Sequence, residues 1–394
     1  MGHAYKKEAI IAAVCFIFLT SAGCARAVER DYYSATKHVS SPEQAVFPDD
    51  GISDYFDLKN AVLNLVHSGV SERMIRIGSY KGNLDDDLSR ISKNLSRQDA
   101  RTAYSVTSIN FEQTRILTYQ EIRISIQYSK SEQDMQNIVN VINSTDFEKE
   151  ISRELTDFPA KLAFYLSYYS DDSFRTAERF KKAYYNNPNS AFGLSDFDIK
   201  LYPESGTERI AEINISYLTD TAELKQKSQK VSEEAQKLLK NLRSNDPAFT
   251  ALNIYNYLVE NVTFDRQAMR VVSETAGTQP KSDPYTSYGA LVNKTASYEG
   301  YAIAYKKLCD MLGLECTVIT GKFKDKTPVI WNLIKLNGEW YHVDAGSAAF
   351  TGSKADYFCI DDEAMSKTHE WNLGMYPAAE GNEYSFQSVL KKAK

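Results

Sequence analysis

The stretch from Tyr288 to Phe350 constrains the fold of this chain more than any other feature. A run with apolar residues at helical spacing opens at Ser297-Tyr298-Glu299-Gly300-Tyr301-Ala302 and ends at Gly313, a residue typical of helix C-termini. Two extended segments follow, Val329-Ile330-Trp331-Asn332 and Trp340-Tyr341-His342-Val343-Asp344. Between them, Asn337-Gly338 is typical of a two-residue hairpin turn. The stretch therefore predicts one apolar helix followed by a strand hairpin.

These motifs resemble those of the transglutaminase-like superfamily, which is related to the papain-like cysteine proteases, and in particular its bacterial secreted branch. Members typically read Cys-Glu-Gly-Tyr-Ala at the head of a helix, His-Ala-Trp-Asn on one strand and Trp-Tyr-His-Val-Asp on the next. The resemblance covers roughly residues 246 to 378. It continues through Tyr357-Phe358, Asp361-Asp362-Glu363-Ala364-Met365 and Thr368-His369-Glu370-Trp371. It implies an α+β domain with a cysteine–histidine–aspartate triad.

The triad positions of this chain do not carry the family's chemistry. Aligned on the motifs, Tyr298 stands at the nucleophilic cysteine and Val329 at the histidine, and only Asp344 matches the acid. A phenol with a reference pKa of about 10 is a weak nucleophile at pH 7, and valine cannot carry a proton. Losing a nucleophile or base from such a unit costs on the order of a million-fold in turnover. We therefore expect a transglutaminase-like fold without its reaction, which acts by binding or scaffolding.

A rearranged active site is the alternative interpretation. Ser297 precedes Tyr298, and alternation along a strand places His342 and Asp344 on one face. Such a serine–histidine–aspartate set would make the chain a peptidase, an amidase or a protein-crosslinking transferase. Two points weigh against it. Ser297 is one position before the family's cysteine, and neighbouring side chains at a helix start point about 100° apart. His342 belongs to the family's Trp-Tyr-His-Val-Asp motif, so it already has a structural explanation.

Two expectations remain open for the cleft that holds the active site in the family. In the first, Tyr298 is an aromatic plug that packs against Val329 and fills the space vacated by the cysteine and histidine. In the second, the cleft is remodelled and still binds a peptide or glycan. The residues expected to line such a cleft are Ser297, Glu299, Trp331 and His342.

The first 23 residues have the pattern of an export signal. The apolar run Ala9 to Leu19 is too short to span a bilayer, which needs about 20 residues. Leu19-Thr20-Ser21-Ala22-Gly23-Cys24 resembles a bacterial lipobox, which implies cleavage before Cys24 and diacylation of its sulfur with palmitate-type chains. An ordinary signal peptide cut near Ala22 or Ala25 is the alternative. The lipoprotein interpretation places the protein outside the cytoplasm, anchored to the cell membrane.

Charge and cysteine content limit the partners. The chain has a net charge of −6, which argues against nucleic acid. Apart from Cys24 and the signal-peptide cysteine, the cysteines are irregularly spaced, so neither a disulfide framework nor a zinc site is expected. They are Cys309, Cys316 and Cys359. We expect no metal and no cofactor. The expected partners are the membrane, through the lipid, and a cell-wall peptide, glycan or envelope protein. His38, His67 and His369 lack partners at metal-ligand spacing.

An internal repeat occupies residues 52 to 218. Tyr80 matches Tyr169 and Tyr128 matches Tyr217, both at an offset of 89 residues. Each copy reads helix, strand, helix, strand, strand, with helices expected at 56–66, 84–95, 135–155 and 173–185. The fold class is therefore α+β, with two tandem modules ahead of the transglutaminase-like domain. The expected organisation is a signal peptide at 1–23, a tether at 24–51, modules at 52–130 and 131–218, a linker helix at 219–245 and the transglutaminase-like domain at 246–394.

Overall fold

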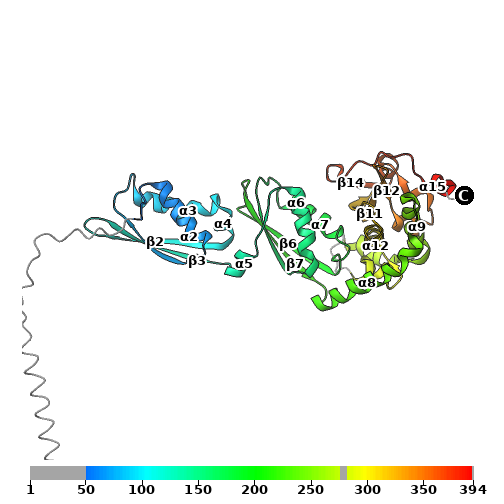
Figure 1. The fold of residues 1–394 in the computed structure, drawn as a ribbon, viewed down its shortest axis with the longest axis horizontal. Helices are drawn as coiled ribbons and strands as arrows, with labels where there is room; N and C mark the ends of the chain where they lie inside the picture. The colour runs from blue at the N-terminus through cyan, green and yellow to red at the C-terminus, as the bar shows by residue number, and fades with distance from the viewer. Residues whose placement is uncertain (1–49, 276–281, 393–394) are drawn as a thin grey trace, which may run out of the picture. The chain divides into compact units, whose positions relative to one another are not determined.

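The computed structural model describes residues 50–275 and 282–392 (Figure 1). The expected signal peptide, the lipid site at Cys24 and nearly all of the expected tether lie outside these residues. The described part of the chain mixes helices and strands, as the sequence predicts. No helix in it combines the length and apolar character needed to cross a membrane.

The first module is a three-stranded antiparallel sheet covered by helices. Ile122, Ile124 and Ile126 of its central strand are buried, whereas Arg123 and Gln127 between and beside them are exposed, so one face of the strand faces the core. The strand order is β1-β3-β2. Its elements are α2 (Tyr55–His67), β1 (Glu72–Ile77), α3 (Leu84–Gln98), α4 (Ala100–Ser105), β2 (Val106–Arg115) and β3 (Gln120–Tyr128).

The second module has a four-stranded sheet in the order β4-β5-β7-β6. The single helix expected at 135–155 is wrong, because β4 interrupts it and pairs in parallel with β5. Residues at β4 form long-range strand hydrogen bonds that local helical spacing cannot reveal. The elements are α5 (Glu132–Gln136), β4 (Val139–Val141), α6 (Ser144–Glu154), η1 (Leu155–Asp157), β5 (Lys161–Leu166), α7 (Ser173–Tyr185), β6 (Leu194–Tyr202) and β7 (Arg209–Tyr217).

The two modules share the order and register of three strands. In the first sheet Val106 lies opposite Tyr128, and the register shifts before Ser108. In the second, Leu194 lies opposite Tyr217, and the register shifts at the corresponding place. This correspondence agrees with a duplication, which itself stays a prediction. The added β4 and the short helix α4 distinguish the two modules.

The C-terminal part contains a five-stranded antiparallel sheet in the order β13-β12-β11-β10-β14. The expected linker helix is α8 (Thr221–Leu242), and Asp246 caps the next helix, α9 (Pro247–Asn261). The strands are β10 (Cys316–Phe323), β11 (Pro328–Leu336), β12 (Glu339–Val343), β13 (Phe358–Ile360) and β14 (His369–Trp371). Asn337 and Gly338 both have positive φ, which is typical of the tight hairpin turn predicted there.

Helices and short segments complete this part of the chain. Residues 266–287 are expected to be loop-like, which is wrong for α10 (Arg266–Thr275), because Asp265 caps it by accepting from two backbone N–H groups. The other elements are β8 (Thr263–Phe264), η2 (Asp283–Tyr285), α11 (Ser287–Leu291), β9 (Thr295–Ala296), α12 (Tyr298–Leu312), α13 (Ala345–Thr351), η3 (Ala355–Tyr357), α14 (Asp362–Ser366), η4 (Leu373–Met375) and α15 (Phe386–Lys392).

Helix α12 is the centre of the C-terminal core and contacts β10, β11, α8 and α9 (Figure 1). Ala302 and Ile303 pack in one apolar cluster with Val318 and Ile330 of the sheet. Tyr301 and Tyr305 belong to another cluster with residues of α8 and α9. Gly313 ends the helix in the left-handed conformation, as its sequence position predicts. The buried helix fixes where its first residue, Tyr298, meets the sheet.

Candidate functional site

Tyr298 is the first residue of α12, and its side chain is enclosed by aromatic rings. Its ring centroid lies 4.8 Å from that of Phe264, 5.2 Å from Phe323 and 6.1 Å from Phe350. Only 6% of Tyr298 is exposed. Its hydroxyl lies 3.9 Å from Sδ of Met269, which is a weak acceptor. Tyr298 thus fills the place that the family's alignment gives to the nucleophile.

The electrostatic surroundings keep the Tyr298 phenol neutral. Burial raises its pKa well above the ordinary value, and the negative charge of Asp344 raises it further. A phenol becomes a strong nucleophile only after it loses its proton. The side chain therefore contributes packing at this position and no nucleophile near pH 7.

Two glycines allow the chain to close around the start of α12. A Cβ on Gly300 would lie 2.4 Å from the carbonyl oxygen of Pro284. A Cβ on Gly346 would lie 2.9 Å from Cδ1 of Tyr298 and 3.4 Å from Oδ1 of Asp344. Both distances to the nearest atom are shorter than real Cβ contacts. Gly346 therefore lies against both the Tyr298 ring and the Asp344 carboxylate, and there is no room for a side chain at position 346.

Val329 and Asp344 lie near Tyr298, as the alignment implies. Val329 is a buried residue of β11 and belongs to the same apolar cluster as Tyr298 and Trp331. Asp344 follows the last residue of β12 and caps α13, where its Oδ1 accepts from the backbone N–H of Ser347 at 2.8 Å. Val329 offers no group that could take a proton, so the family's base is absent from its aligned position.

His369 is the residue near this site that sequence reasoning missed. Its Nε2 lies 3.2 Å from Oδ2 of Asp344, and both side chains are almost completely buried. The two atoms are close without the alignment of a hydrogen bond. The sequence predicts a surface or structural role for His369, because it has no partners at metal-ligand spacing. The available signal was its position in the Thr368-His369-Glu370-Trp371 motif, which the family shares.

Strand pairing explains how His369 reaches Asp344. Strand β14 pairs with β10 and places His369 opposite Phe323. The His369 ring lies 4.7 Å from the Phe323 ring and 4.8 Å from the Trp331 ring. These rings hold the imidazole on the face of the sheet that also carries Val329. The acid of the family's triad therefore faces a histidine from another strand.

His342 is a structural residue with both ring nitrogens in use. Its Nδ1 accepts from Nε1 of Trp331 at 2.9 Å, and its Nε2 lies 2.8 Å from Oδ1 of Asp362. Because the indole only donates, Nδ1 has no proton, and Nε2–H donates to Asp362. Burial lowers the pKa of His342 to about 4, against the opposing effect of Asp362. The imidazole is therefore neutral at pH 7.

The alternative relay of Ser297, His342 and Asp344 is not assembled. The Ser297 hydroxyl donates to the carbonyl of Pro284 at 3.2 Å, and His342 bonds Trp331 and Asp362 instead of Asp344. As a correction to the expected cleft lining, Ser297, Trp331 and His342 are buried packing residues. Glu299 is half-buried and accepts from the hydroxyl of Tyr185 at 3.2 Å. The arrangement agrees with the aromatic plug.

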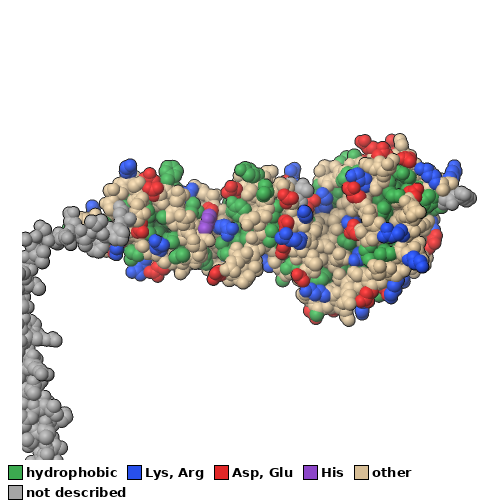
Figure 2. Space-filling view, viewed as in Figure 1, with side chains coloured by type: hydrophobic (Ala, Val, Ile, Leu, Met, Phe, Trp, Pro, Cys, Tyr) green, Lys and Arg blue, Asp and Glu red, His purple; other side chains and the backbone are tan. Residues whose placement is uncertain are grey.

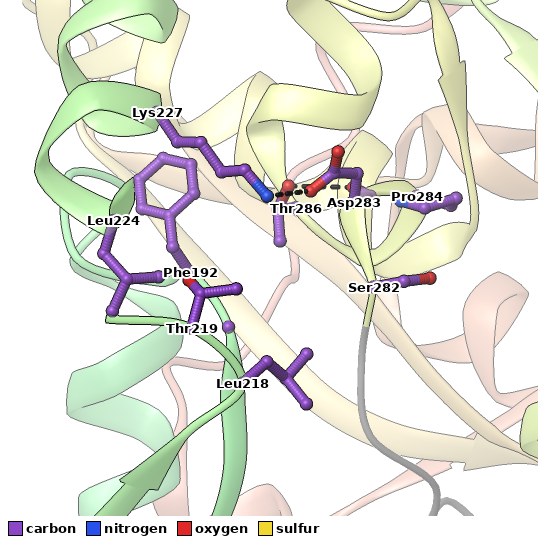
Figure 3. Close-up of a pocket in the computed structure, with 10 residues that line it drawn as sticks. Phe192, Leu218, Thr219, Leu224, Lys227, Ser282, Asp283, Pro284 and Thr286 are labelled. Atoms are coloured by element: carbon purple, nitrogen blue, oxygen red, sulfur yellow. Dashed lines mark hydrogen bonds and ion pairs between the residues drawn. The ribbon is translucent and has the colours of Figure 1, made fainter. Parts of the chain in front are cut away.

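A pocket of about 430 Å³ is lined on one side by the segment Ser282, Asp283, Pro284 and Thr286, which precedes α12 in the chain (Figure 3). Lys227 of α8 bonds Oδ1 of Asp283 at 2.7 Å and also pairs with Glu223 at 3.1 Å. The backbone N–H of Ser297 donates to Pro284, which links the pocket wall to the start of α12. The lining residues are Phe192, Gly193, Leu218, Thr219, Leu224, Lys227, Ser282, Asp283, Pro284 and Thr286. Nothing in the sequence pattern pointed to this pocket.

No metal centre is found in the described residues, where no three histidine, cysteine, aspartate or glutamate side chains group together as ligands. Cys309, Cys316 and Cys359 are buried free thiols, as expected. Burial raises the pKa of Cys309 and of Cys359 well above the ordinary value. A thiol with a raised pKa stays protonated near pH 7, so neither Cys309 nor Cys359 is an activated nucleophile.

Residues 226–345 match the family model of the transglutaminase-like superfamily, so this part of the chain is a transglutaminase-like domain. The match begins inside α8, ahead of the boundary expected at 246. A solved structure described as a TGase is similar at 12% identity and a TM-score of 0.26, over 59% of this chain and 63% of that chain. A structure described as a cysteine protease of Cytophaga hutchinsonii is similar at 12% identity and a TM-score of 0.22, over 39% and 62%. Both matches span less than two thirds of the solved chain. No curated protein matches the sequence.

Proposed function

We propose that this chain is a lipoprotein, anchored to the cell membrane through Cys24, whose transglutaminase-like domain has lost its reaction and acts by binding or scaffolding at the cell envelope. One observation carries the loss of reaction. Tyr298 fills the nucleophile's place, and its ring packs against Phe264, Phe323 and Phe350. A substrate carbonyl could reach this position only if those rings moved.

The remaining acid supports the same proposal. In the family's triad, the carboxylate orients the histidine that shares the nucleophile's proton. Here Asp344 caps α13 through Ser347 and faces His369. These structural contacts account for a buried carboxylate at position 344 without a reaction. Keeping Asp344 is therefore no argument for thiol-dependent catalysis.

The pocket in Figure 3 supports the binding half of the proposal. Phe192, Leu218 and Leu224 form an apolar side, and Lys227 and Asp283 form a polar side. Pockets of this kind take a small ligand or one side chain of a peptide. Lys227 and Asp283 pair with each other, so the charged part of the lining has no net charge. The pocket suits an apolar group next to a polar one, such as a residue of a cell-wall peptide.

Two experiments test this function. Soluble cell-wall peptide fragments, titrated into the purified protein by calorimetry, should bind to wild type and fail to bind Leu218→Trp, which fills the pocket. Leu117→Trp is the matched control, because Leu117 is fully exposed and does not line the pocket. Equal binding by both variants would remove the pocket from the proposal. Labelling by a serine-directed phosphonate at Ser297 would instead support the rearranged hydrolase.

A further inference from the structure

The side chains of Thr368, His369 and Asp344 form a series of hydroxyl, imidazole and carboxylate at the start of β14. Oγ1 of Thr368 lies 2.7 Å from Nδ1 of His369. On the other side of the ring, Nε2 lies 3.2 Å from Oδ2 of Asp344. Thr368 is exposed, whereas His369 and Asp344 are each only 1% exposed. The reactive end of the series therefore faces solvent and the other two members lie in the protein interior.

The direction of the contact between Thr368 and His369 depends on the tautomer of the ring. When the ring hydrogen is on Nε2, towards Asp344, Nδ1 has a lone pair and accepts from the Thr368 hydroxyl. The carbonyl oxygen of Met365, at 3.5 Å, is a second and more distant acceptor for this hydroxyl. In the tautomer with the hydrogen on Nε2, His369 can act as a general base that takes the proton of a nucleophilic hydroxyl.

Packing holds the imidazole in this orientation. The rings of Phe323 and Trp331 lie within 4.8 Å of the His369 ring, centroid to centroid. The backbone N–H of Lys324 donates to the carbonyl of Thr368 at 3.1 Å, so the threonine is tied to the end of β10. Nε2 of His369 and Oδ2 of Asp344 lie 3.2 Å apart without hydrogen-bond alignment. Asp344 would therefore act on the imidazole through its charge, as a positioning residue.

Three lysines gather on the surface around Glu370, two residues after Thr368. Three lysines of the β10–β11 turn region approach Glu370, with Nζ to carboxylate distances of 3.4 Å for Lys322, 3.8 Å for Lys324 and 2.9 Å for Lys326. These three lysines share the single carboxylate of Glu370, so this group has more cationic than anionic side chains. A positive surface favours a ligand with a negatively charged group.

We propose that Thr368 is a nucleophile that takes an acyl group from a donor with an anionic leaving group, such as an acyl phosphate. Oγ1 of Thr368 attacks the acyl carbon, and its proton passes to Nδ1 of His369. The bond from the acyl carbon to the phosphate oxygen breaks, and phosphate leaves with the electron pair. The product is an ester at Thr368. This site is separate from the family's positions at Tyr298 and Val329.

Acetyl phosphate with the purified full chain tests the proposal, with peptide mapping by mass spectrometry as the readout. Thr368 should gain one acetyl group, and Thr368→Val should gain none at that position. Thr351→Val is the matched control, because Thr351 is an exposed threonine whose hydroxyl donates to the carbonyl of Ser347. That control should acetylate at Thr368 like wild type.

Two further variants separate activation from simple exposure. His369→Gln should slow the acetylation of Thr368 by roughly a hundred-fold or more, since general-base assistance contributes about that much. Acetylation of lysines by the same reagent serves as the internal reference and should not change. Asp344→Asn should slow Thr368 alone, while Asp344→Glu should restore part of the rate. Acetylation of Thr368 no faster than that of Thr351, or unaffected by His369→Gln, would overturn the proposal.

Discussion

The Oδ2 atom of Asp344 and the Nε2 atom of His369 lie 3.2 Å apart in the protein interior. Asp344 is the acid that matches the family's triad, but His369 comes from β14 and not from the position of the family's histidine on β11. That position holds Val329, which packs with Tyr298 in an apolar cluster. The residue aligned with the family's acid therefore lies next to an imidazole, whereas the positions aligned with the nucleophile and base hold Tyr298 and Val329.

The role of Tyr298 as a packing residue predicts a contrast between two tyrosine variants. Tyr298→Phe should change the free energy of unfolding by less than about 0.5 kcal/mol, since the sulfur of Met269 is the only hydrogen-bond partner of its hydroxyl among the described residues. Tyr301→Phe should cost about 1 to 3 kcal/mol, because it leaves the buried carbonyl of Val262 without its donor. Tyr298→Ala should cost on the order of 3 to 5 kcal/mol. Urea unfolding measures all three, and equal costs for the two phenylalanine variants would show that the Tyr298 hydroxyl has a strong partner.

The proposed loss of the triad predicts whether replacing Tyr298 and Val329 restores transglutaminase activity. The unmodified protein and Tyr298→Cys should not incorporate a fluorescent amine into a glutamine-containing protein, because Val329 supplies no base. Tyr298→Cys combined with Val329→His should give a trace of activity that iodoacetamide abolishes, with Val329→His alone as the inactive control. Thiol-dependent turnover by the unmodified protein, lost on replacing Cys309, Cys316 or Cys359, would contradict the proposed loss of reaction.

The buried His342 predicts a pH dependence of stability. Burial lowers its pKa to about 4 in the folded protein, below the value of about 6.5 expected when the chain is unfolded. The unfolded chain therefore binds the proton more readily, and the stability due to neutral His342 is complete above pH 6.5 or so and falls towards pH 4. One such proton changes the unfolding free energy by at most about 1.4 kcal/mol per pH unit.

His342→Gln provides the comparison for this effect. Glutamine can accept from Trp331 and donate to Asp362, as His342 does, but it does not titrate. Urea unfolding of wild type and variant between pH 7 and pH 5 should show a steeper loss of stability in wild type. Parallel curves would mean that His342 keeps an ordinary pKa or that another group dominates in this range.

The proposed lipid anchor predicts the behaviour of Cys24→Ala. Without a thiol at this position no acyl chain can be attached, so the variant should leave the membrane fraction or remain unprocessed. Metabolic labelling with a palmitate analogue, followed by fractionation, measures both outcomes. Cys15→Ala is the control and should still be labelled. A Cys24→Ala variant that is processed and stays with membranes as wild type does would refute the anchor.

Several features of the C-terminal part could be predicted from local sequence. The start of α12 at Tyr298 and its end at Gly313 follow from helical spacing and from the left-handed backbone that glycine adopts readily. The hairpin at Asn337 and Gly338 follows from turn chemistry. The expected loss of the family's nucleophile and base rests on the residue types at 298 and 329 alone, and it stays a prediction. These properties depend on neighbours in sequence, which the sequence displays directly.

Other features were decided only by the tertiary structure. Local patterns predicted one helix across 135–155, but pairing with β5 made Val139–Val141 a strand. His369 met Asp344 because β14 pairs with β10, and His342 turned to Trp331 and Asp362 instead of Asp344. A strand can choose among distant partners, and a buried polar side chain bonds whichever group packing brings within reach. Sequence therefore determined which groups this chain has, and packing between distant segments determined which of them meet.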